Sequence, residues 1–229
     1  MKITFLGHSG FRLHSGDTVL LVDPWLDGNP VFPEGREAEA TSGTTHIALT
    51  HGHGDHASNA VAIARQTGAQ ILCGHELSIL LGGDDGAETV GFGKGGTVQA
   101  GDFTLTMVHA VHSSSIEGAG LAYAGGEAGL ILRAEGRTIY VSGDTDVIAD
   151  MGLIADRYQP DIGILCCGGR YTMDMEGAAY AARKFFDFNI VIPCHWGTFP
   201  ILAQSAQPLV DALPGIDVRV LDPMQTTEV

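Results

Sequence analysis

The chain has 229 residues, of which 27 are acidic and 12 are lysine or arginine, so its formal net charge at pH 7 is −15. Nucleic acids and anionic membranes are bound through basic surfaces, so this balance argues against both kinds of partner. The hydrophobic fraction is 45% and the charged fraction is 17%, which excludes a disordered or fibrous chain. The length suits one domain spanning residues 1–229.

The sequence predicts neither a membrane span nor a secretion signal. No stretch approaches about 18 consecutive apolar residues. The apolar run within the first ten residues, MKITFLGHSG, is too short for the core of a signal peptide. The cysteines Cys73, Cys166, Cys167 and Cys194 form no C-x-x-C pair. We therefore expect four reduced, buried thiols and a cytoplasmic protein.

Short apolar runs alternate with a helical pattern in the first half of the chain. Strands are predicted at residues 2–6, 11–14, 18–22, 47–50, 71–73, 103–108 and 121–124. Apolar side chains at 57, 60, 61 and 64 have helical spacing, which predicts a helix over 56–66 that stops before Gly68. The glycine-rich segment 82–96 is expected to be a surface loop.

The second half of the chain alternates strands and helices more regularly. Strands are predicted at 129–133, 138–142, 161–166, 190–194 and 218–221. One helix is expected to follow Asp146 as its N-cap, a second to run from Met175 to Phe186, and a short third to cover 205–213. The pattern predicts an α/β fold with two sheets covered by helices. No repeat or linker divides the chain.

Four side chains of the types that bind metals fall within the segment His51-Gly52-His53-Gly54-Asp55-His56. In an extended chain, His51 and His53 project to the same side. Asp55 and His56 lie where the next helix begins, so they can face a second point nearby. One loop can thus supply ligands to two adjacent metals. The alternative, a solvated histidine-rich turn, is far less compatible with so specific a spacing.

Three further residues of ligand type each follow a predicted strand, where loops commonly place functional groups. His112 follows the strand at 103–108, Asp144 follows the strand at 138–142, and His195 follows the strand at 190–194. Taken singly, each has an ordinary alternative, a hydrogen-bonded core histidine or a turn aspartate. Their joint occurrence with the cluster at 51–56 favours a metal site.

Together these residues resemble the ligand pattern of the metallo-β-lactamase superfamily, in the order used for its two-metal site. The resemblance extends over essentially the whole chain. It is greatest for a branch of small bacterial metal-dependent hydrolases related to the ascorbate-6-phosphate lactonases. The stretches that carry it are Gly7-His8-Ser9, Val22-Asp23-Pro24, His51–His56, His112-Ser113-Ser114-Ser115, Gly143-Asp144-Thr145, Tyr171-Thr172-Met173 and His195–Pro200.

The resemblance implies an αββα sandwich with the metals at the open edge where the two sheets meet. It implies that one divalent ion is held by His51, His53 and His112. A second ion would be held by Asp55, His56 and His195, and the carboxylate of Asp144 would bridge both. The residues implied to support these ligands or to face the substrate are His8, Asp23, Arg170, Trp196 and Thr198.

His109 is the rival of His112 as a ligand. Along an alternating strand, His109 shares a face with the apolar residues of 103–107, so we expect it to pack in the core. We expect His14, His46 and His75 to be structural. The chain departs from the pattern of the branch at Gly169 and Arg170, because relatives often carry an acidic residue at the first of these positions. The positive charge of Arg170 is expected to alter the pocket wall.

The implied activity is hydrolysis of a small lactone, phosphodiester or related ester by a hydroxide that bridges two metals. Metal binding lowers the pKa of water to about 7, and the two aspartates, Asp55 and Asp144, would carry the catalytic centre. Two divalent ions bring four positive charges, and Asp55, Asp144 and the hydroxide together bring three negative ones. The centre then has a net charge of +1, which suits an anionic transition state. Nitrogen and oxygen ligands suit Zn²⁺, while Mn²⁺ and Fe²⁺ are acceptable.

Other functions fit the sequence less well. A secreted β-lactamase would be expected to carry a signal peptide, and commonly a cysteine ligand where this chain has Asp144. A nuclease of the same superfamily would be expected to carry a basic patch, whereas the 12 cations here are scattered. A non-catalytic metal-binding or redox module remains as an alternative of a different class. The expected partner is a small-molecule substrate, and a homo-oligomer is compatible with the sequence.

Overall fold

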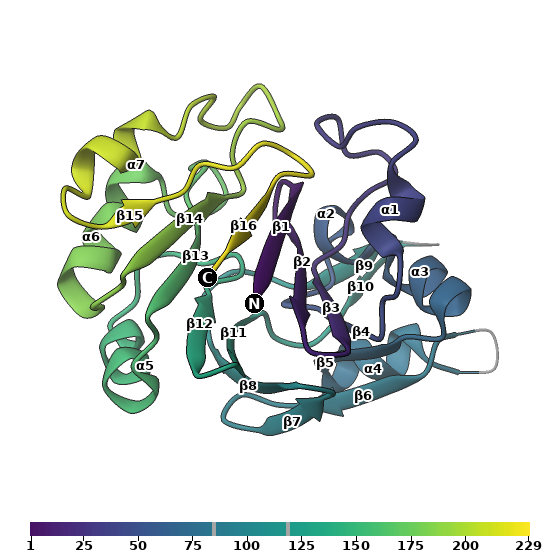
Figure 1. Ribbon diagram of the computed structural model, residues 1–229. Helices are drawn as coiled ribbons and strands as arrows, with labels where there is room; N and C mark the ends of the chain where they lie inside the picture. The colour runs from purple at the N-terminus through teal and green to yellow at the C-terminus, as the bar shows by residue number, and fades with distance from the viewer. Residues whose placement is uncertain (84–85, 118–119) are drawn as a thin grey trace.

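The computed structural model describes residues 1–83, 86–117 and 120–229. Two seven-stranded mixed sheets face each other, and helices cover their outer sides (Figure 1). This arrangement confirms the αββα sandwich expected from the sequence. Among the described residues, no helix has the length and apolar character that crossing a membrane would require.

The first sheet has the strand order β16-β1-β2-β3-β4-β5-β6. Its antiparallel part is formed by β16, β1, β2 and β3, and β3 to β6 run parallel to one another. The strands are β1 (Lys2–Gly7), β2 (Gly10–Ser15), β3 (Thr18–Val22), β4 (His46–Ala48), β5 (Gln70–Gly74), β6 (Thr89–Phe92) and β16 (Thr226–Glu228).

The second sheet has the strand order β15-β14-β13-β12-β11-β8-β7. Strands β7, β8, β11 and β12 pair antiparallel, and β12 to β15 pair parallel. The strands are β7 (Thr97–Ala100), β8 (Phe103–His109), β11 (Ala128–Ala134), β12 (Arg137–Val141), β13 (Ile162–Cys166), β14 (Ile190–Cys194) and β15 (Asp217–Val218).

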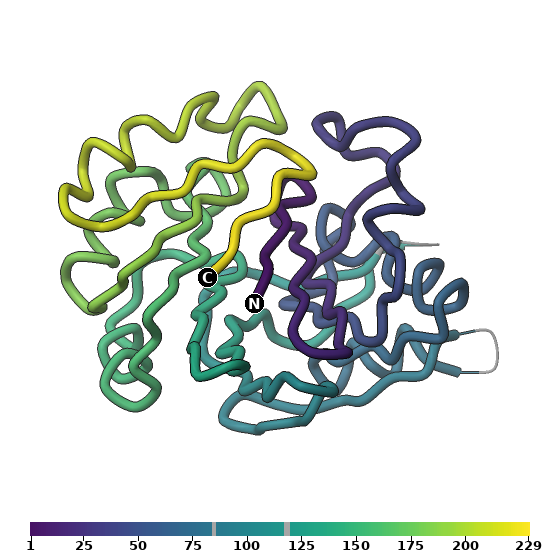
Figure 2. The backbone as a smooth tube through the Cα atoms, viewed as in Figure 1, coloured from purple at the N-terminus to yellow at the C-terminus, as the bar shows by residue number. Residues whose placement is uncertain are grey.

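The remaining elements are seven helices and one hairpin of the described residues. The helices are α1 (Glu37–Thr41), α2 (Gly54–Ala57), α3 (Ala60–Thr67), α4 (His75–Leu81), α5 (Asp150–Tyr158), α6 (Met175–Phe185) and α7 (Gln207–Ala212). Strands β9 (Ser115–Glu117) and β10 (Leu121–Tyr123) pair antiparallel apart from both large sheets. The chain ends lie side by side (Figure 2), because β1 and β16 pair at one edge of the first sheet, and the Met1 amino group lies 3.3 Å from the Val229 carbonyl.

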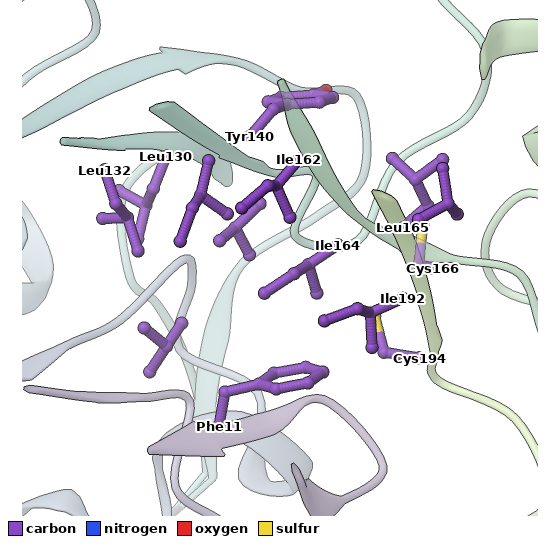
Figure 3. Close-up of a cluster of buried hydrophobic side chains, with 14 of the residues drawn as sticks. Phe11, Leu130, Leu132, Tyr140, Ile162, Ile164, Leu165, Cys166, Ile192 and Cys194 are labelled. Atoms are coloured by element: carbon purple, nitrogen blue, oxygen red, sulfur yellow. The ribbon is translucent and has the colours of Figure 1, made fainter. Parts of the chain in front are cut away.

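The main hydrophobic core lies between the sheets. Phe11 of the first sheet faces Ile164 and Ile192 of the second (Figure 3), and all three side chains are fully buried. Alternation along a strand sends every second residue to the other face. Thus Leu20 of β3 joins this core, while Leu21 joins a smaller cluster under the helices of the first sheet.

Local signals explain where the best-predicted helices begin and end. Asp174 caps α6, because its carboxylate accepts a hydrogen bond from the Gly177 amide at 2.7 Å. The alanines Ala178 and Ala182 of α6 then pack into the core. Helix α3 ends at Gly68, whose left-handed backbone (φ 76°) closes the last turn.

Several predicted boundaries were wrong. The helix expected over 56–66 is two helices, α2 and α3, and the later helix begins at Asp150 rather than after Asp146. The strand expected at 218–221 is 217–218, and 121–124 forms a hairpin strand outside the large sheets. The expected loop at 82–96 contains β6, although its residues 84–85 lie outside the described residues. The strands β6, β10 and β15 have only two to four residues each, which is too short for a clear alternation.

Two substitutions that shorten an apolar side chain should differ strongly in their effect on the free energy of unfolding. We expect Ile164→Ala to lower the free energy of unfolding by about 2–5 kcal/mol, because the cavity it leaves lies between two packed sheets. Leu153→Ala, on a side chain that is 71% exposed, should change it by less than about 0.5 kcal/mol. Urea unfolding of both variants beside the wild type checks this. Equal losses would show that Ile164 does not lie in the core.

Candidate metal centre

Loops that follow strands of both sheets bring the predicted ligands together at one edge. Strand β4 leads into the segment 51–56, and β12 and β14 lead into Asp144 and His195. The sheets are joined at this edge by backbone hydrogen bonds: the His195 amide donates to the His8 carbonyl at 2.7 Å, and the Ala128 amide donates to the Thr50 carbonyl at 3.0 Å. The ligands therefore come from loops that the two sheets hold in fixed relation.

The first group of candidate ligands is His51, His53 and His112. One nitrogen of each imidazole can be chosen so that all three lie within 4.8 Å of one another. His51 Nε2 lies 3.0 Å from His53 Nδ1, and the ring centroid of His112 lies 5.3 Å from that of His51. These are the three residues that the sequence assigned to one ion.

The second group contains Asp55, His56 and His195, and the structure adds His8 to it, again with ligand atoms within 4.8 Å of one another. Asp55 Oδ1 lies 4.0 Å from His56 Nε2, and Asp55 Oδ2 lies 3.9 Å from His195 Nε2. His8 Nε2 lies 3.1 Å from Asp55 Oδ2. The sequence placed His8 near the metals, and the structure shows that it contacts the ligand carboxylate directly.

Asp144 lies between the two groups. Its Oδ1 is 3.4 Å from His56 Nε2, and its Oδ2 is 3.1 Å from His195 Nε2 and 3.6 Å from His112 Nε2. The preceding residue, Gly143, has a left-handed backbone (φ 58°), and a Cβ at this position would lie 2.4 Å from the Ala128 carbonyl oxygen. Glycine is therefore required where the chain turns to aim Asp144 at both groups.

The hydrogen bonds of Asp23 leave two imidazole nitrogens free for metals. The Thr50 hydroxyl donates its one proton to Asp23 Oδ2 at 2.6 Å, so it accepts from His51 Nδ1 at 3.0 Å. His56 Nδ1 donates to the same Asp23 oxygen at 2.8 Å. In the neutral form of both imidazoles Nε2 is then the nitrogen without a proton, which is the form that a metal ion binds. Such carboxylate–histidine pairs are typical of metal sites.

Unpartnered polar atoms show that these residues fit cations. His56 Nε2 and Asp144 Oδ1 are buried and have no hydrogen-bond partner in the described protein. A buried polar atom without a partner costs about 1–3 kcal/mol, so a site that concentrates such atoms requires a further group. Imidazole nitrogens and carboxylate oxygens are suitable ligands for a divalent transition metal.

The buried carboxylates of the centre favour a positive charge beside them. Burial alone would lower the pKa of His56, but the carboxylates of Asp144 and Asp23 outweigh it and hold that pKa well above its usual range. Burial would raise the pKa of Asp144, but His56 and His195 hold it well below its usual range. By contrast, burial lowers the pKa of His8 to about 4 and keeps that imidazole neutral. The site thus stabilises an ionised carboxylate together with a cation.

Three residues of the centre have a left-handed backbone. His8, Asp23 and His195 all have positive φ values, of 55°, 45° and 58°. Residues other than glycine adopt this conformation rarely and at a cost of about 1–3 kcal/mol each. The surrounding hydrogen bonds retain it: the His195 amide donates to His8, and the Thr50 amide donates to Asp23 at 2.8 Å.

A cavity of about 340 Å³ gives access to the ligands. Its lining residues are His53, Asp55, His112, Ser113, Asp144, Tyr171 and His195. Arg170, which the sequence placed in the pocket wall, is exposed and is not among these residues, whereas its neighbour Tyr171 is. Thr198 meets His8 Nδ1 at 2.8 Å, and the Trp196 indole donates to the Pro193 carbonyl at 3.3 Å.

The expectation for His109 was half wrong. His109 does not belong to either group of ligands, but it does not pack in the core: its side chain is 44% exposed, and Nδ1 lies 2.6 Å from Asp150 Oδ2. It is the last residue of β8 and still pairs with Ala128, but at this end of the strand alternation no longer predicts burial. His14, His46 and His75 likewise belong to none of the ligand groups found among the described residues.

Comparisons with known proteins agree with this geometry. Residues 2–195 match the family model described as a beta-lactamase superfamily domain. The chain is 59% identical to a UPF0173 metal-dependent hydrolase of Dinoroseobacter shibae over 229 residues, all of both chains, and 54% identical to one of Paracoccus denitrificans over 98% of both. The chain belongs to the metallo-β-lactamase superfamily.

Within that superfamily the structure resembles Igni18, a metallo hydrolase from the archaeon Ignicoccus hospitalis. The TM-score is 0.85 at 31% sequence identity, over 99% of this chain and 97% of the other. The curated relatives are metal-dependent hydrolases that this chain matches from end to end. The protein is therefore a metal-dependent hydrolase, and the His and Asp clusters of the metallo-β-lactamase fold are its candidate metal sites.

The two rival histidines give the first test of the ligand set. We expect His112→Ala to lose about one equivalent of bound metal and nearly all hydrolysis, because His112 completes the first group. His109→Ala should keep its metal, because His109 belongs to neither ligand group, and loss of its exposed contact with Asp150 should change the stability by only about 0–1 kcal/mol. Elemental analysis and thermal melting of both variants check this. Metal loss in His109→Ala, with full metal in His112→Ala, would overturn the assignment.

Asp144→Asn tests whether one carboxylate serves both groups. An amide offers a single oxygen acceptor and no charge, so we expect weaker binding of one metal and turnover lower by about a hundredfold or more. The fold should persist, because the amide is nearly isosteric. Metal content, melting temperature in excess metal and turnover are measured beside the wild type. Wild-type turnover with two metals bound would contradict a bridging role.

Proposed function

We propose that the protein is a dinuclear metallohydrolase that acts on a small lactone, phosphodiester or related ester. The observation that carries the proposal is Asp144, whose two oxygens lie within 3.6 Å of imidazoles from both ligand groups. A carboxylate so placed can contribute to two ions at once. We propose Zn²⁺ as the metal, with Mn²⁺ or Fe²⁺ as alternatives, because the ligands are imidazoles and carboxylates without thiolates.

When bound, the divalent ions supply a water of lowered pKa as nucleophile and polarise the carbonyl or phosphoryl oxygen of the substrate. The chain's own residues hold that chemistry in place. Asp23 and Thr50 set the tautomers of His51 and His56, and His8 orients the Asp55 carboxylate. Asp55 and Asp144 are the proposed catalytic carboxylates, since both line the cavity that admits substrate.

The cavity supports a small molecule as substrate. Its volume of about 340 Å³ lies in the usual range for small-ligand sites. The net charge of −15 supports the proposal that nucleic acid is not a partner. Cys73, Cys166, Cys167 and Cys194 are all unpaired and buried, which supports the proposal of a cytoplasmic location.

Metal content and turnover test the proposal together. Purified without chelator, the protein should contain about two transition-metal ions per chain, and it should hydrolyse at least one member of a panel of lactones, phosphodiesters, carboxylic esters and thioesters. Removal of the metal by a chelator should abolish turnover, and added Zn²⁺ should restore it. One firmly bound ion with full activity, or activity that survives complete metal removal, would overturn the dinuclear proposal.

A further inference from the structure

A second cavity opens beside the first. Its volume is about 480 Å³, and its lining residues are Trp25, Asp27, His53, Gly54, Asp55, Ser58, Ser115 and Phe199. His53 and Asp55 line both cavities. A substrate whose reacting bond lies among the metal ligands therefore has room to extend past these two residues into the second cavity, which we call the side cavity.

An aromatic pair forms one wall of the side cavity. Trp25 follows β3 and Phe199 follows β14, so the two rings come from different sheets, and they stack with centroids 5.7 Å apart and planes inclined by 26°. Both rings also pack edge-on against the imidazole of His8, at centroid distances of 5.3 and 5.5 Å. Since His8 is hydrogen-bonded to both Asp55 and Thr198, the aromatic wall is fixed relative to the candidate metal ligands.

The charges of the side cavity exclude one kind of occupant. Within the described part of the chain, its acidic lining residues are Asp27 and Asp55, and neither Lys nor Arg contributes to it. A phosphate or carboxylate placed there would lose water without gaining a cationic partner, and Asp27 would repel it. A flat apolar group would instead bury its surface against Phe199 and stack on it.

We propose that the side cavity binds an uncharged aryl or similarly flat apolar group of the substrate. Trp25 and Phe199 favour that group, and Asp27 disfavours an anionic group at the same position. The inference rests on the proposed hydrolytic function, because it locates the group relative to the bond that reacts. It assigns Phe199 as a specificity-determining residue. Anionic charge on the substrate is then accepted only among the metal ligands.

The first experiment measures binding without turnover. Acetanilide, a hydrolysis-resistant neutral aryl amide, is titrated into the metal-loaded protein by calorimetry. We expect Phe199→Ala to weaken its binding about tenfold, because the stacking face is removed. The matched control is Tyr180→Ala, which removes an aromatic ring that is 49% exposed on α6 and lines neither cavity. This variant should bind acetanilide as the wild type does.

The second experiment uses two esters that share one reacting bond, phenyl acetate and para-acetoxybenzoate. Only the second carries a carboxylate on the ring. We expect kcat/KM to be at least about tenfold higher for phenyl acetate, and Phe199→Ala should reduce this preference. Ser58→Lys places a cation in the side cavity at an exposed position, so it should raise kcat/KM for para-acetoxybenzoate relative to kcat/KM for phenyl acetate.

The outcomes separate this inference from the proposed function. Equal kcat/KM for the two esters, with neither Phe199→Ala nor Ser58→Lys changing their ratio, would overturn the side-cavity assignment and leave hydrolysis intact. If the protein hydrolyses neither ester, the binding experiment decides: acetanilide bound through Phe199 supports the side cavity, and acetanilide binding that Phe199→Ala does not change overturns it. Phe199→Leu, which keeps an apolar side chain, controls for loss of folding.

Discussion

The buried charge of Asp144 is the constraint around which the rest of the structure is arranged. Only 2% of this residue is exposed, yet its pKa is held well below the usual range, so it is ionised where water cannot solvate it. An unpaired charge in such a place costs several kcal/mol. His56 and His195 approach it to within 3.4 Å, and a metal ion held by these residues would supply further positive charge.

The sheets hold this charge in place by meeting at one edge. The bond from the His195 amide to the His8 carbonyl joins the loops of opposite sheets directly beneath the ligands. The left-handed backbones of His8, Asp23 and His195 store strain that a looser loop would release. The packed core between the sheets, with Phe11 against Ile164, supplies the rigidity that retains this strain (Figure 3).

The two neighbouring cavities differ in charge. A metal ion held by the candidate ligands would concentrate positive charge at one point of a protein whose net charge is −15. The side cavity beside these ligands is lined by Trp25 and Phe199 together with Asp27, so its chemistry differs from that of the first cavity. His8 connects them, since it contacts the ligand Asp55 on one side and the aromatic pair on the other.

Much of the fold and of the candidate metal site could be predicted from the sequence. The ligand-rich loop 51–56, the strands and an α/β fold with two covered sheets follow from spacing and alternation, which are properties of neighbouring residues. The αββα sandwich was implied by the resemblance to a known superfamily. Only the tertiary structure decided that His109 pairs with Asp150 at the surface, and that Trp25 stacks on Phe199 from the opposite sheet. It likewise brought His8 onto Asp55. These contacts join residues 41 to 174 positions apart, and no local pattern encodes them, because they exist only once the two sheets have packed.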